Sequence, residues 1–212
     1  MKRVSFDRKV AGILLAAGAS NRMGTLKQLL PVAGVTLVER ALTTALKSRL
    51  DRLVLVLGHR APEIETALGG VTRDPKLTVV HNRLYREGIS SSLVAGIREI
   101  DHSHDHGMIL LADMPFIDHD VINLLIEGYL EAELPMGAIK IGARTAHPVV
   151  FRRDLFVELK TLTGDVGARS LLKKYNDRVC LITPGAGYDG RDIDNREDYR
   201  NFQTDLKERN KA

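Results

Sequence analysis

The sequence predicts an α/β fold with a mostly parallel sheet that helices cover on both faces. Short apolar runs alternate with segments of helical periodicity, which is the pattern of repeated strand–helix units. Several of these runs are apolar throughout, as expected of strands that are buried on both faces. With 212 residues, of which 44% are hydrophobic and 27% charged, the chain can fill one core of ordinary composition. We therefore expect a single domain over residues 1–212.

The first part of the chain contains the most regular pattern. Apolar runs predict strands at Val10–Ala16, Leu53–Leu57, Leu77–Val80 and Met108–Leu111. Helical spacing between and after them predicts helices at Thr36–Ser48, Ala61–Leu68, Ser90–Ile100 and Asp118–Glu131. Pro62 suits the first turn of its helix. Because strands and helices alternate, successive strands are expected to run parallel.

The regularity loosens after residue 135. Two short apolar segments, Met136–Lys140 and Pro148–Phe151, and a later one, Val179–Ile182, predict strands. Helices are expected at Arg152–Thr161, Val166–Tyr175 and Arg196–Arg209. We expect this last third of the chain to contribute to substrate binding.

Charge and cysteine content narrow the class of protein. The 31 basic and 27 acidic residues are interspersed and give a net charge of +4, which favours small anionic ligands. With only 5% aromatic residues and no concentrated basic face, nucleic acid is not an expected partner. Cys180 is the single cysteine, which excludes an internal disulfide and is typical of a reducing compartment. No apolar run approaches the roughly 20 residues that span a bilayer, and MKRVSFDRKV does not resemble a signal peptide. We expect a cytoplasmic protein with no membrane partner.

A glycine-rich segment, LAAGASNRMGTLK, follows the first predicted strand. Ligands of such sheets bind beyond the carboxyl ends of the strands, and small residues let backbone N–H groups approach an anion. Arg22 and Lys27 add positive charge. The spacing of Gly18 and Gly24 fits neither a dinucleotide-binding fingerprint, which argues against a dehydrogenase, nor a Walker A loop. The alternative is a simple strand-to-helix turn with a solvated arginine and lysine.

Carboxylates follow strands at two places. Asp113 lies directly after the run that ends at Leu111, where a single carboxylate suits Mg²⁺ together with phosphate oxygens and water. The alternative role, capping the next helix, suits Asp118 better. Asp192 and Asp194 occupy alternate positions and so point to one side if the segment is extended. Asp194 could instead cap the last helix.

Other polar residues leave more than one interpretation open. Ser90, Ser91 and Ser92 open a predicted helix, where they could bind a ligand or serve as caps. Arg169 could pair with a phosphate or with a structural carboxylate. His59 follows a strand but could equally be solvated. The run DHSHDH at residues 101–106 precedes a strand, and we expect it to be a solvated loop rather than a metal site.

The segment LAAGASNRMGTLKQLLP resembles the signature L-A-A-G-x-S-x-R-M-G-x-x-K-x-L-L-P of nucleotidyltransferases, in the branch that contains molybdenum cofactor cytidylyltransferases. Later blocks of that family match in order: REGISSSLVAGI, LLADMPFID, HPVVF, LTGDVGARSLL and DIDNREDY. The match runs from about residue 10 to residue 200. It implies a Rossmann-like three-layer α/β/α sandwich of the nucleotide-diphospho-sugar transferase type, in agreement with the strand–helix pattern.

The resemblance also implies roles for individual residues. The catalytic residues would be Arg22, Lys27 and Asp113. The nucleotide would be bound by Leu15, Ala16, Ala17, Gly18, Ser20, Arg22, Gly24, Lys27, Ser91 and Asp113. The acceptor would be bound by Ser90, Ser92, His147, Asp165 and Arg169, and the metal by Asp113 and Asp194. Residues 10–120 would form the nucleotide- and metal-binding part and residues 121–200 the acceptor-binding part. Two departures from the family pattern are Ala146, where Gly-His-Pro is usual, and Asn195-Arg196, where Thr-Pro is usual.

By the same resemblance, the activity would be Mg²⁺-dependent transfer of a nucleoside monophosphate to a phosphorylated acceptor, with release of pyrophosphate. Ala17 favours CTP over GTP, because the guanylyltransferase branch tends to Leu-Ala-Gly-Gly. The acceptor of the best-known family members is molybdopterin, and a molybdoenzyme would be a further partner. Three alternatives stay open: another small phosphorylated acceptor, GTP as donor, and a non-catalytic nucleotide-binding chaperone of a molybdoenzyme.

Overall fold

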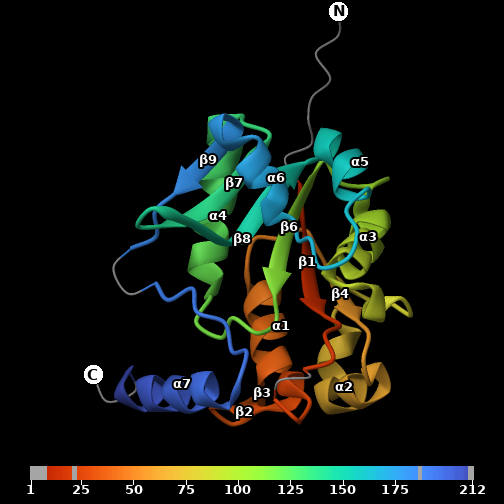
Figure 1. The fold of residues 1–212 in the computed structure, drawn as a ribbon, viewed down its shortest axis with the longest axis vertical. Coiled ribbons are helices and arrows are strands. Elements are labelled where there is room, and N and C mark those ends of the chain that lie inside the picture. Colours follow the sequence, from red (N-terminus) through yellow and green to blue (C-terminus); the bar gives the residue numbers. More distant parts are fainter. Residues whose placement is uncertain (1–8, 21–22, 186–187, 210–212) are drawn as a thin grey trace, which may run out of the picture.

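A seven-stranded sheet forms the centre of the protein, in a computed structural model that describes residues 9–20, 23–185 and 188–209 (Figure 1). In sheet order the strands are β5 (Leu77–His81), β4 (Arg52–Leu57), β1 (Val10–Ala16), β6 (His106–Leu111), β8 (Arg144–Arg152), β7 (Met136–Ile141) and β9 (Val179–Ile182). The neighbouring pairs among β5, β4, β1 and β6 are parallel, as is the pair β7–β9. The prediction of a mostly parallel sheet is confirmed.

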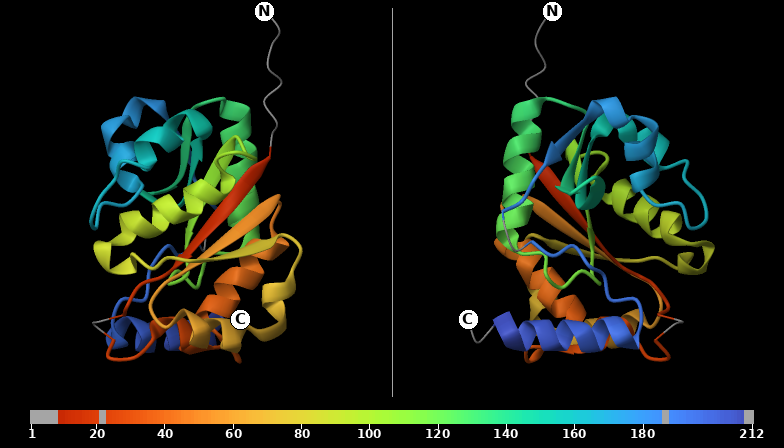
Figure 2. Two further views of the ribbon diagram at one scale, coloured as in Figure 1. Left: turned by 90° about the vertical axis from the view of Figure 1, so that its right-hand side faces the viewer. Right: turned by 60° about the vertical axis from the view of Figure 1, so that its left-hand side comes forward.

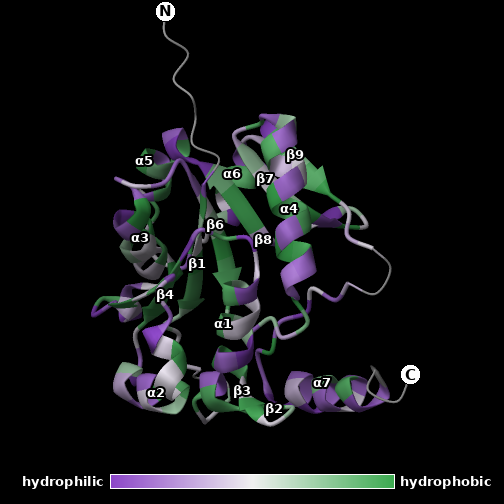
Figure 3. Ribbon diagram, turned by 180° about the vertical axis from the view of Figure 1, so that it is seen from behind, coloured by the Kyte–Doolittle hydropathy of each residue, from purple (hydrophilic) through white to green (hydrophobic). Residues whose placement is uncertain are grey.

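Helices cover both faces of the sheet, so the fold is the expected three-layer α/β/α sandwich (Figure 2). One face packs against α1 (Leu37–Lys47), α2 (Ala61–Leu68) and α4 (His119–Ala132). The other face packs against α3 (Ile89–Ile100), α5 (Phe156–Leu159) and α6 (Arg169–Lys174). The strands are mainly hydrophobic, while the helices carry hydrophilic residues along their outer sides (Figure 3). Among the described residues, no helix combines the length and apolarity that crossing a bilayer requires.

The last helix, α7 (Arg196–Arg209), packs away from the sheet against a small hairpin of β2 (Pro31–Val32) and β3 (Val35–Thr36). A third apolar cluster joins them, in which the ring of Phe202 meets the ring of Phe116 edge-on at 4.8 Å between centroids. Since Phe116 closely follows Asp113 in sequence, this packing holds α7 close to the end of β6. A hydrogen bond also holds the segment before α7 at the end of β6: the N–H of Ile193 donates to Asp113 O at 2.9 Å.

The predicted elements occur with small shifts at their ends, except in the C-terminal third. The helix expected over Arg152–Thr161 is a 3₁₀ turn followed by the four residues of α5, and α6 is shorter than the expected Val166–Tyr175. Strand β8 is antiparallel to both β6 and β7, because a tight turn at Gly142, with φ of +56°, connects β7 directly to it. The hairpin β2–β3 was not predicted, since strands of two residues leave no periodicity to detect.

The prediction of a solvated loop at residues 101–106 needs a correction. It lies at the amino end of β6, away from the carboxyl ends, as expected, but it is not solvated throughout. His104 and His106 are buried, and Nδ1 of His106 lies 2.9 Å from the hydroxyl of Tyr129. Asp101 forms an ion pair with Lys160. The side chains of this run therefore stabilise the packing of α4 and α5 against the sheet.

Candidate active site

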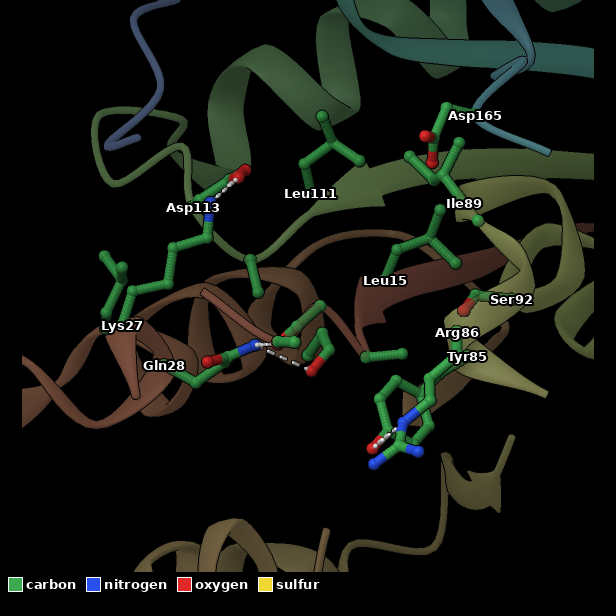
Figure 4. Close-up of a pocket in the computed structure, with 17 residues that line it drawn as sticks. Leu15, Lys27, Gln28, Tyr85, Arg86, Ile89, Ser92, Leu111, Asp113 and Asp165 are labelled. Atoms are coloured by element: carbon green, nitrogen blue, oxygen red, sulfur yellow. Dashed lines mark hydrogen bonds and ion pairs between the residues drawn. The ribbon is translucent and has the colours of Figure 1, made fainter. Parts of the chain in front are cut away.

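A cavity of about 460 Å³ lies beyond the carboxyl ends of β1 and β6 (Figure 4). Most of its lining comes from four segments: the loop after β1, the 3₁₀ turn Lys27–Leu29, the approach to α3, and the loop after β6. Leu37 of α1 and Asp165 complete it. The residues that the sequence pointed to here are Leu15, Ala16, Ala17, Gly18, Lys27, Ser92, Asp113 and Asp165. The sheet therefore brings the glycine-rich loop and Asp113 together, because the parallel strands β1 and β6 end side by side.

The loop after β1 is held from behind by a buried amide. Gln28 is 3% exposed, and its Nε2 donates to Ala16 O at 3.1 Å and to Gly18 O at 2.8 Å. Its Oε1 accepts a hydrogen bond from the Ser20 hydroxyl at 3.1 Å. The N–H of Lys27 in turn donates to that hydroxyl at 3.2 Å. The loop and the 3₁₀ turn thus form one hydrogen-bonded unit.

Lys27 lies between two carboxylates. Its Nζ is 2.6 Å from Asp113 Oδ2 and 3.3 Å from Asp194 Oδ1, and it also donates to Ile193 O at 3.2 Å. Burial acts to lower the pKa of Lys27, but the neighbouring carboxylates outweigh it, so this pKa is raised above its usual value. Lys27 is therefore a charged ammonium group that neutralises the two aspartates.

Neither aspartate provides the helix cap that was its alternative role. Helix α4 is capped by Asp118, whose Oδ1 accepts from the N–H of Val121 at 2.8 Å. At the start of α7, Oδ1 of Asn195 accepts from two backbone N–H groups, at 2.8 and 3.0 Å. Asp113 and Asp194 instead face the ammonium of Lys27 at the edge of the cavity.

The residues present fit a divalent cation. Oδ1 of Asp113 is buried and has no hydrogen-bond partner within the described part of the chain, which is costly for an anionic oxygen unless a cation completes it. Mg²⁺ is typically held by one or two carboxylates plus phosphate oxygens and water. Within those same described ranges no group of three or more His, Cys, Asp and Glu side chains could hold a metal by itself. Asp113 and Asp194 thus suit an ion that arrives with phosphate, rather than a closed structural site.

Asp192 lies apart from this pair. It lines a small cavity of about 220 Å³ beside Phe116 and α7, and among the described residues the carboxylates that form an ion pair with Lys27 are those of Asp113 and Asp194. Burial raises the pKa of Asp192, with a further contribution from the charges of Asp113 and Asp194. Although alternate residues were expected to face one side, the structure brings only Asp194 to the lysine.

A second cavity, of about 860 Å³, adjoins the first. Leu15, Ile89, Leu111 and Asp165 line both, whereas His147 and Arg169 line only the second. His147 is 7% exposed; burial, together with the charge of Arg169, lowers its pKa to about 4, so the ring is neutral at pH 7. Its Nδ1 lies 3.5 Å from Ile109 O, which favours the tautomer that carries the proton on Nδ1.

The three serines at the start of α3 line different cavities, although the hydroxyls of Ser91 and Ser92 both accept from Asn82 Nδ2, at 2.9 and 3.0 Å. Ser92 lines the first cavity, whereas Ser90 and Ser91 line a separate hollow of about 410 Å³ formed with residues 162–164. The single hydroxyl hydrogen of Ser91 has two carbonyl acceptors within reach, Leu84 O at 2.8 Å and Gly88 O at 2.9 Å. The structure therefore places Ser92, and not Ser91, beside the glycine-rich loop.

A close approach between two backbones positions Asp165. Gly88 has φ of +99°, and a Cβ there would lie 2.2 Å from the carbonyl of Gly164. The N–H of Ser90 donates to Gly164 O at 3.2 Å. The segment that contains Asp165 is thereby pressed against the start of α3, which leaves Asp165 at the boundary between the two cavities.

The signature contains three further expected site residues: Ser20, Arg22 and Gly24. Of these, Ser20 and Gly24 do not line the cavity. Arg22 lies outside the described residues. Ser20, with φ of +56°, turns its hydroxyl toward Gln28 and Lys27, and Gly24, with φ of +64°, lies near the guanidinium of Arg196. His59 contacts the loop from outside through its N–H, which donates to Ala17 O at 3.1 Å.

Three polar residues at the cavity were not picked out from the sequence: Gln28, Tyr85 and Arg86. Gln28 lies in the KQLLP segment of the signature, at a position where the family pattern prescribes no residue type. The one signal for Gln28 was its polar side chain directly before the apolar residues Leu29 and Leu30. Tyr85 and Arg86 lie in a short 3₁₀ turn that hydrophobic periodicity does not reveal.

Comparison with known proteins identifies relatives over almost the whole chain. The MobA-like NTP transferase domain matches residues 12–179. Nicotine blue oxidoreductase of Paenarthrobacter nicotinovorans is 32% identical over 89% of this chain and 93% of its own. Purine catabolism protein PucB of Bacillus subtilis is 35% identical over 76% of this chain and 80% of its own. Molybdenum cofactor cytidylyltransferase of Escherichia coli is 29% identical over 51% of this chain and 54% of its own.

Solved structures share the fold. A homologue of Mycobacterium tuberculosis Rv0371c from Mycobacterium sp. strain JC1 is 27% identical, with a TM-score of 0.82 over 96% of this chain and 99% of its own. Rv0371c itself, in a complex with manganese, is 24% identical, with a TM-score of 0.74 over 92% of this chain and 97% of its own. Together with the matched domain, these relatives show that the chain belongs to the family of MobA-like NTP transferases.

Proposed function

We propose that this nucleotidyltransferase transfers CMP from CTP to a phosphorylated acceptor of the molybdopterin type and releases pyrophosphate. The observation that carries the proposal is the meeting of Lys27, Asp113 and Asp194 at the edge of a cavity walled by the glycine-rich loop. A lysine and two carboxylates beside a backbone anion site suit a triphosphate that arrives with Mg²⁺.

In this reaction the chain itself supplies positioning and charge. The acceptor phosphate is already an anion, so no strong general base is needed. The N–H groups of the loop, with Lys27 and Arg22, would bind the phosphates and the developing charge of the leaving group. Asp113 and Asp194 would hold Mg²⁺, which when bound neutralises the phosphate oxygens. A structural relative, Rv0371c, was obtained with manganese, which supports a divalent ion of this kind.

The two adjoining cavities suggest how the substrates would be arranged. The nucleotide would occupy the cavity beside Ala17 and Gly18, and the acceptor the larger cavity with His147 and Arg169. Asp165, at the boundary, would contact the acceptor near the reacting phosphate. The neutral ring of His147 would then offer Nε2 as a hydrogen-bond acceptor. The division into a nucleotide part at residues 10–120 and an acceptor part at residues 121–200 stays a prediction, as does the acceptor role of Ser90.

The proposed identities of the nucleotide base and of the acceptor are based on relatives and on Ala17. The E. coli relative is a molybdenum cofactor cytidylyltransferase, whereas another relative, from Natranaerobius thermophilus, is a probable molybdenum cofactor guanylyltransferase. Ala17 favours the cytidylyl reaction. A cytoplasmic location fits the single cysteine. A molybdoenzyme would receive the product.

A second candidate function is oxidation or reduction of a heterocyclic compound. It is favoured by the 32% identity with nicotine blue oxidoreductase. The trio of Lys27, Asp113 and Asp194 has no evident use in such a reaction, whereas nucleotidyl transfer uses all three. We therefore rank nucleotidyl transfer first.

One experiment tests nucleotidyl transfer and the alternatives for its donor, its acceptor and a chaperone role. Pyrophosphate release is measured with each of the four nucleoside triphosphates, with and without molybdopterin and Mg²⁺. We expect release with CTP only when both are present. Release with GTP would correct the base, and release only with a different phosphorylated acceptor would correct the acceptor. Nucleotide binding without any release would favour the chaperone alternative and refute the proposed enzyme.

A further inference from the structure

Three successive carbonyl groups of the glycine-rich loop accept hydrogen bonds from other parts of the protein. Ala16 O and Gly18 O accept from the amide of Gln28, and Ala17 O accepts from the N–H of His59. By contrast, within the described residues the N–H groups of Gly18 and Ala19 have no hydrogen-bond partner. Three successive carbonyls are thus satisfied by the protein, while adjacent N–H groups are left for a ligand.

This distribution matters for binding an anion. A carbonyl oxygen turned toward a phosphate would repel it, whereas an N–H group donates to it. Glycine and alanine residues can rotate their peptide planes at little cost, so a loop of this composition does not hold its carbonyls in one direction by itself. An outside donor is needed to fix them.

Gln28 supplies such a donor, and both the nitrogen and the oxygen of its amide form hydrogen bonds. A primary amide has two N–H bonds, and both carbonyls that Nε2 reaches belong to the loop. Its oxygen accepts from Ser20, which adds a third attachment to the same loop. Figure 4 shows the amide of Gln28 turned toward the loop, with its two donated bonds drawn.

The position of Gln28 also links the loop to the carboxylates. It follows Lys27 in the same 3₁₀ turn, and Lys27 reaches Asp113 and Asp194. Because one short turn holds both side chains, the direction of the loop N–H groups is set relative to the aspartates. A phosphate chain bound at the loop would therefore meet them in one geometry.

We propose that Gln28 is a positioning residue for the phosphate chain of the nucleotide: it fixes the loop carbonyls away from the cavity so that the loop N–H groups face the phosphates. The proposal rests on the proposed function, in that the loop must bind a nucleoside triphosphate. In this role Gln28 acts through the loop and not through a contact of its own with the phosphates.

The test uses Gln28→Met, which keeps the length of the side chain and removes its hydrogen bonds. Binding of CTP, of CMP and of inorganic tripolyphosphate is measured by calorimetry in the presence of Mg²⁺. We expect affinity for CTP and for tripolyphosphate to fall at least about tenfold, as expected when directed hydrogen bonds to a ligand are lost. Affinity for CMP should fall less, because fewer phosphate oxygens are involved. A general loosening of the fold would weaken all three to a similar degree.

A second variant and a control complete the test. Gln28→Glu keeps the acceptor for Ser20 but replaces both donors with a carboxylate beside two carbonyls, and it should lose at least as much affinity. Ser48→Ala is the matched control: this residue is also 3% exposed, and its hydroxyl donates to Ala45 O at 2.6 Å at the end of α1, outside the cavity. It should lose stability without losing affinity.

The outcomes are distinguishable. Wild-type protein that binds no nucleoside triphosphate would refute the proposed function. Wild-type binding together with unchanged CTP and tripolyphosphate affinity in Gln28→Met would refute only the role of Gln28. If both Gln28 variants fail to fold while Ser48→Ala folds, the amide is a structural element of the fold and the positioning role is wrong.

Discussion

The ammonium group of Lys27 lies 2.6 Å from the carboxylate of Asp113, which is 86 positions away in the sequence. Asp194 completes the group, with its Oδ1 3.3 Å from the same nitrogen. Lys27 therefore holds a positive charge between two aspartates that are suited to a divalent cation. Metal and lysine are expected to compete for the same carboxylate oxygens, and the first prediction follows from that competition.

Replacing Lys27 with Met should strengthen metal binding in the absence of nucleotide. Removing the ammonium leaves the negative charge at Asp113 uncompensated, and this increases its attraction for a cation. Calorimetric titration with Mn²⁺ should give an affinity at least about tenfold higher than that of the wild type. Turnover should nevertheless fall, because Lys27 no longer reaches the phosphates. Weaker or equal Mn²⁺ binding would contradict the competition.

Replacing Asp113 with Asn should abolish most of the activity and leave the fold intact. The substitution keeps the shape of the side chain but removes the charge that would hold the metal, and the loss of such an interaction lowers turnover by roughly 10²–10³-fold or more. The measurement is pyrophosphate release at saturating Mg²⁺, with the melting temperature as the check on folding. Asp154→Asn, which affects a surface ion pair with Arg152, is the control and should keep its turnover. Near-wild-type turnover in Asp113→Asn would show that the metal is held elsewhere.

His147 should make the protein less stable in mild acid. Its pKa is about 4 in the folded state, below the value near 6.5 of an exposed histidine, so the unfolded state binds the proton more readily. Above pH 6.5 the ring is neutral in both states, and the stability that this depressed pKa contributes is fully present. As the pH falls from 6.5 toward 4, the free energy of unfolding decreases by up to about 3 kcal/mol.

Denaturant unfolding at several pH values tests this prediction. Between pH 7 and pH 4.5 the wild type should lose more free energy of unfolding than His147→Asn, whose side chain does not titrate. Equal losses in the two proteins would show that His147 does not retain a depressed pKa in solution.

Replacing Gly88 with Ala should destabilise the protein and disturb the first cavity. A Cβ at this position meets the carbonyl of Gly164 at 2.2 Å, and φ of +99° is strained for any residue with a side chain. The cost is expected to be about 2 kcal/mol or more. Thermal unfolding measures it. Gly70→Ala is the control, because open space surrounds that glycine, and it should change stability by no more than about 0.5 kcal/mol.

Much of the fold follows from local sequence pattern. The strand Val10–Ala16 and the helix Ala61–Leu68 have the bounds that periodicity and flanking residues predict. Such elements are readable because the burial of each residue is repeated along a short segment. The arrangement of strand β8 was not readable in this way, because a strand can pair in either direction and the turn at Gly142 decides which.

The sequence by itself determined the family, the order of the motifs and the chemistry of Lys27 and Asp113, because these depend on residue type and spacing. Only the tertiary structure decided which groups meet. It brought Asp194 to Lys27 across 167 positions, separated Ser92 from Ser91, and placed the amide of Gln28 behind the loop. These relationships depend on packing between distant segments, which leaves no periodic trace in the chain.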